Sequence, residues 1–225
     1  MATGEAAIAS AEGTRAYIDQ FVPEDESLLA ARRNAYEVGG AVPVTPVTGA
    51  TLRFLAAAIS AKSVVEIGTG CGTSGIWLLR GMRTGAVLTS VDVEPEHQRL
   101  ARVAFVDAGF GSGRYRLISG RALEVLPRLA DGAYDLVFCD ADLQEYPEYL
   151  AAALRLLRPG GIVAFDGALR ADPVLADPVP ADSALPDPEA AAVSEVREQV
   201  RVDERLVPLL LPIGDGLLAA VKRAG

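Results

Sequence analysis

The chain has 225 residues, half of them apolar and only 6% aromatic, and its 30 acidic residues against 21 basic ones give a formal net charge of −9. This length suits one sizeable α/β domain, which we expect to span residues 1–225. The negative charge argues against a nucleic-acid backbone or an anionic membrane as the main partner, because both attract basic surfaces. No apolar run is long enough to span a bilayer and no signal-peptide pattern opens the chain, so we expect a cytoplasmic protein.

The order of the expected elements indicates a parallel sheet. Residues 14–60 have helical spacing, with a stop at Gly39 and a second helix expected from Thr48. From residue 62 onward, short apolar runs alternate with amphipathic segments, including a helix expected through RALEVLPRLA. This alternation predicts strand–helix–strand units covered on both faces. Two final apolar runs joined by IGDG predict a β-hairpin at the sheet edge, where Pro208 requires an edge or irregular position.

Two segments fall outside that alternation. Residues 1–45 predict an N-terminal helical segment, and residues 171–190 form a Pro/Asp-rich loop, ADPVLADPVPADSALPDPEA. Proline this dense blocks both a helix and a central strand. The loop leaves the sheet at the strand ends where open α/β sheets bind ligands, so it is either a solvated connection or a lid.

The strongest local signal is VVEIGTGCGTSG, in which three alternating glycines follow a strand and precede a helix. Two ligands fit it. Gly70-x-Gly72-x-x-Gly75, with Asp92 further on, matches the dinucleotide fingerprint and predicts a nicotinamide-dependent oxidoreductase. However, these glycines begin late after the strand. Glu66 would also oppose a pyrophosphate, whereas it suits the positively charged amino group of a methionine moiety.

Several motifs together carry a family resemblance. VEIGTGCGTS resembles motif I of S-adenosylmethionine (SAM)-dependent methyltransferases, and LTSVDVEP resembles their second acidic motif. With YDLVFCDAD, PGGIVAFD and LLPIGDGLLAAVK added, the chain is similar to the cation-dependent O-methyltransferases that act on catechols and caffeoyl-coenzyme A, over roughly residues 40–166 and 190–223. The resemblance implies a three-layer Rossmann-like methyltransferase fold with a seven-stranded, mostly parallel sheet whose last strand is antiparallel. It also implies SAM as the cofactor and a homodimer.

The same resemblance implies roles for individual residues. The implied cofactor contacts are Val44, Glu66, Gly68, Thr69, Ser74, Asp92, Val93, Ala122 and Asp142. Glu66 would bind the methionine end and Asp92 the ribose hydroxyls, while Asp142 serves either the cofactor or the start of the following helix. Asp140 and Asp166 match two carboxylate ligands of a divalent cation, Mg²⁺ or Mn²⁺, and Asp140 is the best-placed base if no metal binds.

Two positions depart from the family pattern. Leu143 stands where a catalytic lysine is common, and Gly167 stands where an asparagine metal ligand is common. Metal binding would therefore rest on Asp140 and Asp166, completed by water or by a carboxylate such as Asp172. The sequence predicts O-methylation of a small hydroxylated, phenol- or catechol-like acceptor. The alternatives are a nicotinamide-dependent oxidoreductase and a cofactor-binding protein that has lost catalysis.

Overall fold

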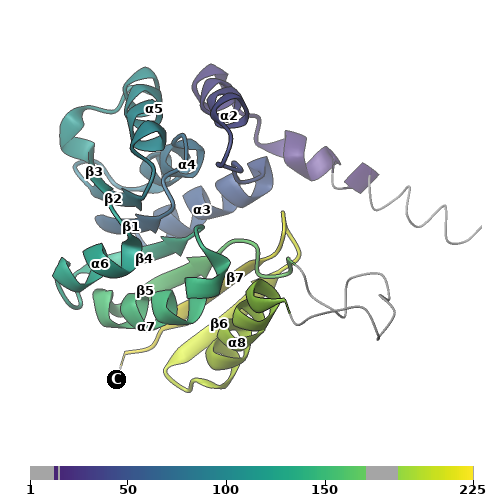
Figure 1. Cartoon of the computed structure of the whole chain (residues 1–225), viewed down its shortest axis with the longest axis vertical. Helices are drawn as coiled ribbons and strands as arrows, with labels where there is room; N and C mark the ends of the chain where they lie inside the picture. Colours follow the sequence, from purple (N-terminus) through teal and green to yellow (C-terminus); the bar gives the residue numbers. More distant parts are fainter. Residues whose placement is uncertain (1–12, 15, 171–186, 225) are drawn as a thin grey trace, which may run out of the picture.

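A seven-stranded sheet runs through the molecule between two layers of helices (Figure 1). The structure is a computed structural model that describes residues 13–14, 16–170 and 187–224. The strands are β1 (Ser63–Ile67), β2 (Val87–Asp92), β3 (Tyr115–Ser119), β4 (Tyr134–Cys139), β5 (Leu157–Phe165), β6 (Leu206–Leu211) and β7 (Leu217–Lys222). Their order is β3-β2-β1-β4-β5-β7-β6, and only β7 runs antiparallel to its neighbours, β5 and β6. The expected three-layer Rossmann-like fold is confirmed.

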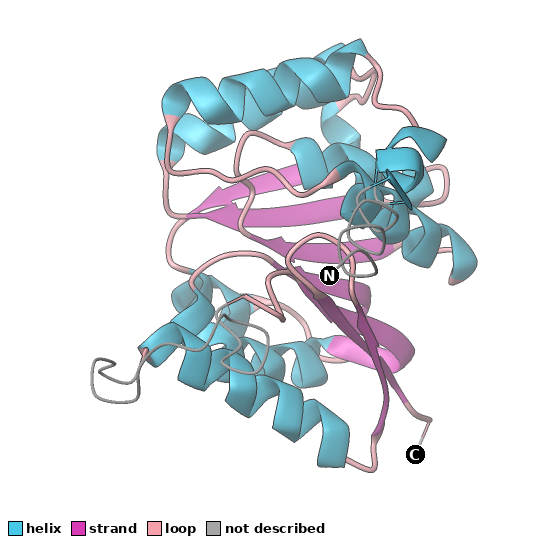
Figure 2. Cartoon of the chain, turned by 90° about the vertical axis from the view of Figure 1, so that its right-hand side faces the viewer, coloured by secondary structure: helices cyan, strands magenta, loops and turns pink. Residues whose placement is uncertain are grey.

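Helices α2 to α5 cover one face of the sheet and α6 to α8 cover the other (Figure 1), and the two layers are seen edge-on in Figure 2. The helices are α2 (Glu26–Val38), α3 (Pro46–Ala58), α4 (Thr73–Gly81), α5 (Pro95–Asp107), α6 (Ala122–Val125), α7 (Tyr146–Leu156) and α8 (Pro188–Val202), with 3-10 turns η1 (Ser112–Arg114), η2 (Leu126–Arg128) and η3 (Leu143–Glu145). Among the described residues, none of the helices has the length and apolar character that crossing a membrane requires.

Each face of the sheet has its own apolar core. Val64 of β1 belongs to the core under α2 to α5, together with Trp77. The next residue, Val65, belongs to the core under α6 to α8, together with Phe165. Successive side chains of a strand point to opposite faces, so a strand buried on both sides needs the continuous apolar run that the sequence shows. The polar residues at the strand ends are then left at one edge of the sheet.

Two local expectations about helices needed correction, and the one about the final hairpin is confirmed. α3 begins at Pro46 rather than at Thr48, because Thr45 caps the helix by accepting from the Thr48 N–H at 3.3 Å and Pro46 occupies the first turn. The helix expected through RALEVLPRLA is only the four-residue α6 followed by η2, where Pro127 has no backbone N–H to continue the α-helix. The hairpin of β6 and β7 is confirmed, with Pro208 on the edge strand as expected.

The Pro/Asp-rich loop ends earlier than expected. Its expected end at residue 190 is wrong because α8 begins at Pro188, where Asp187 caps the helix by accepting from the Glu189 N–H at 3.0 Å. Proline is tolerated in the first turn of a helix because that N–H has no intrahelical partner. Residues 171–186, including Asp172, and residues 1–12 lie outside the described part of the chain, so the lid stays a prediction.

Candidate active site

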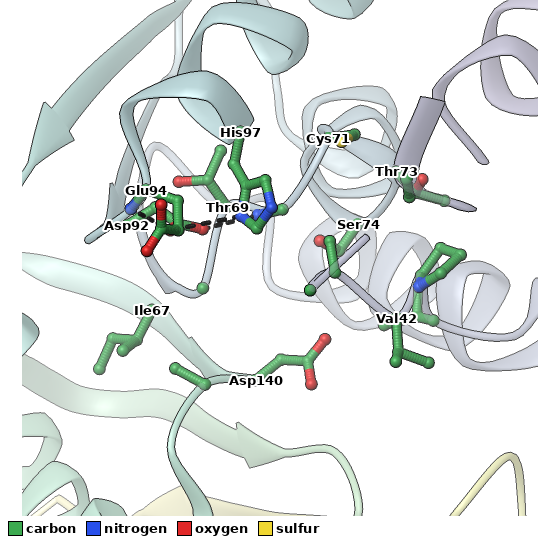
Figure 3. A pocket seen from close by; sticks show the side chains of 18 of the residues that line it. Val42, Ile67, Thr69, Cys71, Thr73, Ser74, Asp92, Glu94, His97 and Asp140 are labelled. Carbon is green, nitrogen blue, oxygen red and sulfur yellow. Dashed lines mark hydrogen bonds and ion pairs between the residues drawn. The ribbon is translucent and has the colours of Figure 1, made fainter. Parts of the chain in front are cut away.

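A cavity of about 970 Å³ opens where the parallel strands end, and segments that follow β1, β2, β3, β4 and β5 line it. This is the edge at which open α/β sheets bind ligands. The residues named from the sequence that line it are Val44, Gly68, Thr69, Ser74, Asp92, Val93, Ala122, Asp140, Asp142 and Asp166. Figure 3 shows Asp92 grouped with His97 and Thr69, while Asp140 lies apart from them across the hollow. The cavity therefore has two distinct acidic ends.

The loop between β1 and α4 approaches the neighbouring strand more closely than a side chain would permit. Gly68 has a φ of +94°, and a Cβ at this position would lie 2.0 Å from the carbonyl oxygen of Asp140. Gly70 and Gly72 also have positive φ values, of 48° and 94°. Glycine adopts such angles without steric cost, so bare backbone forms this wall. The loop leads into the N-terminus of α4, where free N–H groups favour an anionic group.

Asp92, at the end of β2, is fixed by backbone groups. Its Oδ2 accepts from the Gly70 N–H at 2.9 Å, and its Oδ1 accepts from the Glu94 N–H at 2.9 Å. Each carboxylate oxygen retains a second lone pair, so Asp92 can accept two further hydrogen bonds from a diol. His97 lies beside it, with Nδ1 3.6 Å from Asp92 Oδ1 and Nε2 3.2 Å from the Gly39 carbonyl oxygen. The orientation of the Asp92 carboxylate at the cavity wall is thus fixed by backbone N–H groups.

Glu66 is placed behind the glycine loop. Its side chain is fully buried, and it is not among the described residues that line the cavity. Oε2 accepts from the Ser90 hydroxyl at 2.5 Å, while Oε1 has no hydrogen-bond partner in the part of the chain that the structure describes. Burial raises the pKa of Glu66 to about 7, against the opposing effect of the Ser90 and Ser74 hydroxyls. Its contact with the methionine end stays a prediction, and its position is that of a support under the loop.

A hydrogen-bond network that sequence reasoning missed extends this support. The hydroxyls of Thr69 and Ser90 lie 2.7 Å apart, and the Gln98 amide donates to the Thr69 hydroxyl at 3.0 Å and to the Ile118 carbonyl oxygen at 3.1 Å. These groups come from β2, α5 and β3, so they tie the loop to three neighbouring elements. The polar pair Thr89 and Ser90 in the middle of β2 was the sequence signal for it.

The other acidic end consists of Asp140 and Asp166, which follow the neighbouring strands β4 and β5. The Asp140 N–H donates to the Ile67 carbonyl oxygen at 2.8 Å, and the Asp166 N–H donates to the Cys139 carbonyl oxygen at 3.1 Å. Burial raises the pKa of both carboxyls, and the nearby charge of Asp166 raises that of Asp140 further. Asp166 Oδ1 is buried without a hydrogen-bond partner among the described residues. An oxygen of this kind is available to a donor on a ligand.

Asp142 has the structural role that the sequence left open, and it also lines the cavity. Its Oδ1 accepts from the Gln144 N–H at 3.0 Å and begins η3. The next residue, Leu143, is 6% exposed and packs in the core. A Cβ on Gly167 would lie 3.5 Å from Leu143 Cδ2. The two departures from the family pattern therefore meet at one place, and neither is among the described residues that line the cavity.

Three arginines of the cavity wall were missed from the sequence. Arg32 donates to the Val44 carbonyl oxygen at 2.8 Å and holds that segment against the site. Arg121 pairs with Glu145 at 2.7 Å, and Arg170 pairs with Asp215 at 2.9 Å. Asp215 belongs to the IGDG turn, which the sequence indicated only as a turn. The partners are 24 and 45 positions apart along the chain, so local patterns give no signal for these pairs.

The strand order, the glycine loop and the acidic strand ends define the chain as a Rossmann-like methyltransferase. The family model for O-methyltransferases matches residues 20–223, so the chain belongs to the O-methyltransferase family. A protein of Mycobacterium sp. (strain JLS), provisionally named as an O-methyltransferase, is 49% identical over 212 residues, which cover 94% of this chain and 93% of that protein. The expected enzyme class, a SAM-dependent O-methyltransferase, is confirmed.

Solved structures support the same assignment. The O-methyltransferase from Bacillus cereus in complex with SAH is 27% identical, with a TM-score of 0.82 over 94% of this chain and 97% of that one. The O-methyltransferase TomG from Streptomyces achromogenes, involved in tomaymycin synthesis and solved with SAM, is 27% identical, with a TM-score of 0.81 over 94% and 96% of the two chains. Neither neighbour favours the nicotinamide-dependent alternative.

Proposed function

We propose that the chain transfers the methyl group of SAM to a hydroxyl of a small phenol- or catechol-like acceptor. The observation that carries this proposal is that one cavity has Asp92 at one end and Asp140 with Asp166 at the other. The two ends suit two substrates that meet between them. The SAH and SAM complexes of the relatives support the cofactor part of the proposal.

The cofactor would lie against the glycine loop. Asp92 would accept hydrogen bonds from both ribose hydroxyls, because each of its oxygens retains a free lone pair. Half-exposed Val93, just after β2, and buried Ala122, the first residue of α6, would enclose the adenine. The remaining cofactor contacts that we propose are Val44, Gly68, Thr69, Ser74 and Asp142, with Glu66 acting from beneath the loop.

Asp140 is the proposed base. Bound SAM supplies an electrophilic methyl group on a positively charged sulfur. The acceptor hydroxyl gives its proton to Asp140, its oxygen forms a bond to the methyl carbon, and the bond from that carbon to sulfur breaks with its electron pair going to sulfur. Asp166 would orient the acceptor through the Oδ1 atom that has no partner. Positioning of this kind supplies much of the rate of a transfer between two bound groups.

The donor set of the described residues, to which Asp172 does not belong, does not fit a divalent cation held by the protein. Among the described residues, no three His, Cys, Asp or Glu side chains are grouped so that they could hold a metal ion. Gly167 offers no side-chain donor, and Arg170 brings a positive charge to Asp140 and Asp166. The cation assistance expected from the sequence is therefore left out of the proposed mechanism, in which no step passes through a metal.

Calorimetric titration and an activity screen test the proposal. We expect the chain to bind SAH and not NAD⁺, and tight NAD⁺ binding without SAH binding would refute it. Methyl transfer from radiolabelled SAM to a panel of catechols, phenols and hydroxylated metabolites should be lost in Asp140→Asn. The matched control Glu148→Gln changes an exposed carboxylate of α7 and should keep the rate. SAH binding without transfer to any acceptor would instead favour a cofactor-binding protein that has lost catalysis.

We further propose that the chain forms a homodimer in the cytoplasm. Tyr17, Phe21 and Phe54 are 70%, 74% and 69% exposed and border an apolar hollow of about 320 Å³. A contiguous apolar surface of this kind is typical of an interaction site. Light scattering should give the mass of two chains, and Phe21→Ser should shift the mass toward one chain. A monomeric wild-type protein would contradict the proposal, and cell fractionation checks the compartment.

A further inference from the structure

Arg170 is the positively charged residue that acts on the acidic pair at the acceptor end of the cavity. It lines the cavity with Asp140 and Asp166 and interacts electrostatically with both. Its Nη2 atom lies 2.9 Å from Asp215 Oδ2. A guanidinium presents several N–H donors in one rigid plane, so it can contact Asp215 and still direct donors toward the other acids.

The backbone fixes the position of this ion pair. Ala168 and Leu169 donate their N–H groups to the carbonyl oxygens of Gly216 and Asp215, at 2.9 and 2.8 Å. A Cβ on Gly216 would lie 2.4 Å from Leu169 Cγ, so the two turns approach more closely than another residue would allow. The turns that carry Arg170 and Asp215 extend from the paired strands β5 and β7. Arg170 is therefore held at the cavity by a built feature of the sheet edge.

A divalent cation and Arg170 would compete for the same two acids. Both carry positive charge, and like charges in one cavity repel each other, although the water that reaches the half-exposed Arg170 side chain weakens this repulsion. Among the described residues, Gly167 stands where the family commonly has a third donor, and it has no side chain; a Cβ there would already be in contact with Leu143 Cδ2, at 3.5 Å. Asp215, which could otherwise serve, is engaged by Arg170.

We propose that Arg170 is a positioning residue that supplies the positive charge at the acceptor end, and that methyl transfer by this chain needs no divalent cation. The inference rests on the proposed function. Arg170 balances the charges of Asp140 and Asp166 and holds both carboxylates in place while Asp140 takes the acceptor proton. Asp215 anchors the guanidinium from the opposite side.

Manganese binding tests the proposal without an acceptor. The full chain is stripped of metal with EDTA, and the free Mn²⁺ signal is followed by electron paramagnetic resonance during titration. We expect Arg170→Gln to bind Mn²⁺ about tenfold more tightly than wild type, because the change removes a repelling charge and frees Asp215. Arg121→Gln is the matched control, since it removes another arginine of the cavity that is paired with a glutamate at 2.7 Å, and it should leave Mn²⁺ affinity unchanged. Wild-type binding as tight as that of Arg170→Gln would overturn the proposal.

Activity gives a second readout once an acceptor is turned over. EDTA should leave the wild-type rate unchanged, Arg170→Gln should lower kcat while the KM for SAM stays the same, and Arg170→Lys should restore part of kcat. Loss of wild-type activity in EDTA with recovery on Mn²⁺ would overturn the proposal. SAH titration of each variant shows whether the variant is folded and has an intact cofactor site. If the wild type itself does not bind SAH, the proposed function fails, independently of the role of Arg170. If no acceptor is found, the manganese titration decides alone.

Discussion

Glu66→Gln should remove a pH dependence of stability that comes from one buried carboxyl. The Glu66 carboxyl is in contact with water only in the unfolded chain. In the folded protein it is fully buried beneath the glycine loop. Burial raises its pKa from an ordinary value of 4.5 to about 7. The substitution keeps the shape of the side chain and its hydrogen bond with Ser90, but it has no proton to lose.

The sign follows from the two pKa values. Below pH 4.5 the carboxyl is protonated in both states, so its contribution to stability is fully present. Between pH 4.5 and about 7 the unfolded chain releases the proton while the folded chain keeps it, so stability is lost as the pH rises through the folded value. A shift of one pKa unit corresponds to about 1.4 kcal/mol. The difference between about 7 and 4.5 therefore amounts to about 3 kcal/mol of lost unfolding free energy above pH 7.

Urea unfolding of wild type and Glu66→Gln over a pH series measures this difference. The unfolding free energy of Glu66→Gln minus that of wild type should rise by about 3 kcal/mol from about pH 4 to about pH 8. Glu148→Gln, an exposed glutamate on α7, should follow wild type at every pH. If the difference between Glu66→Gln and wild type stays constant with pH, Glu66 is not held protonated by burial and the reasoning is wrong.

Three further predictions concern the loop, the ribose site and the far edge of the sheet. Asp92→Asn should weaken SAH binding by about tenfold to a hundredfold in calorimetry, because it removes a charged acceptor from the ribose site; unchanged affinity would contradict that role. Gly68→Ala should lower the unfolding free energy by about 1–3 kcal/mol or more, since its φ is +94° and the Cβ would meet the Asp140 carbonyl oxygen, and thermal unfolding measures this. Lys222→Met should cost about 1–3 kcal/mol in urea unfolding, because Nζ donates to two carbonyl oxygens at the end of α7 at 2.7 and 2.8 Å. Its SAH affinity should match wild type, and weakened binding would show that the effect reaches the cavity.

The fold was predictable because its signals are local. A strand buried on both faces appears as a short apolar run, and the helix that covers it appears as an amphipathic segment. Right-handed crossovers limit the possible sheet orders, and the family resemblance predicted the seven strands and the antiparallel last strand. The errors lie where side-chain capping decides, as at Thr45 and Asp187, since a residue that ends a loop and a residue that caps a helix look alike in sequence.

The presence at the cavity of the proposed cofactor contacts was also predictable for one short loop and the next strand end, although their contact with the cofactor stays a prediction. Gly68, Gly70 and Asp92 lie within 25 residues of one another, and the Gly70 N–H contacts Asp92 directly. Glu66 is the exception. Its place behind the loop depends on which way one strand side chain points and on the Ser90 hydroxyl across the sheet, neither of which a motif records.

The charge balance of the proposed acceptor end could not be predicted from the sequence, because it depends on contacts between segments that are distant along the chain. Asp140 and Asp166 were found as strand ends, yet what neutralises them depends on Arg170 and on a partner, Asp215, that is 45 positions further along the chain. A motif comparison shows that the family's lysine and asparagine are replaced by Leu143 and Gly167. It cannot show that the Arg170 guanidinium lines the same cavity as the two acids. A lost metal ligand alone would indicate a weakened site. When an arginine lines the same cavity as the acids, the site keeps a positive charge without a metal ion. Absence of the metal ligand then does not require loss of catalysis.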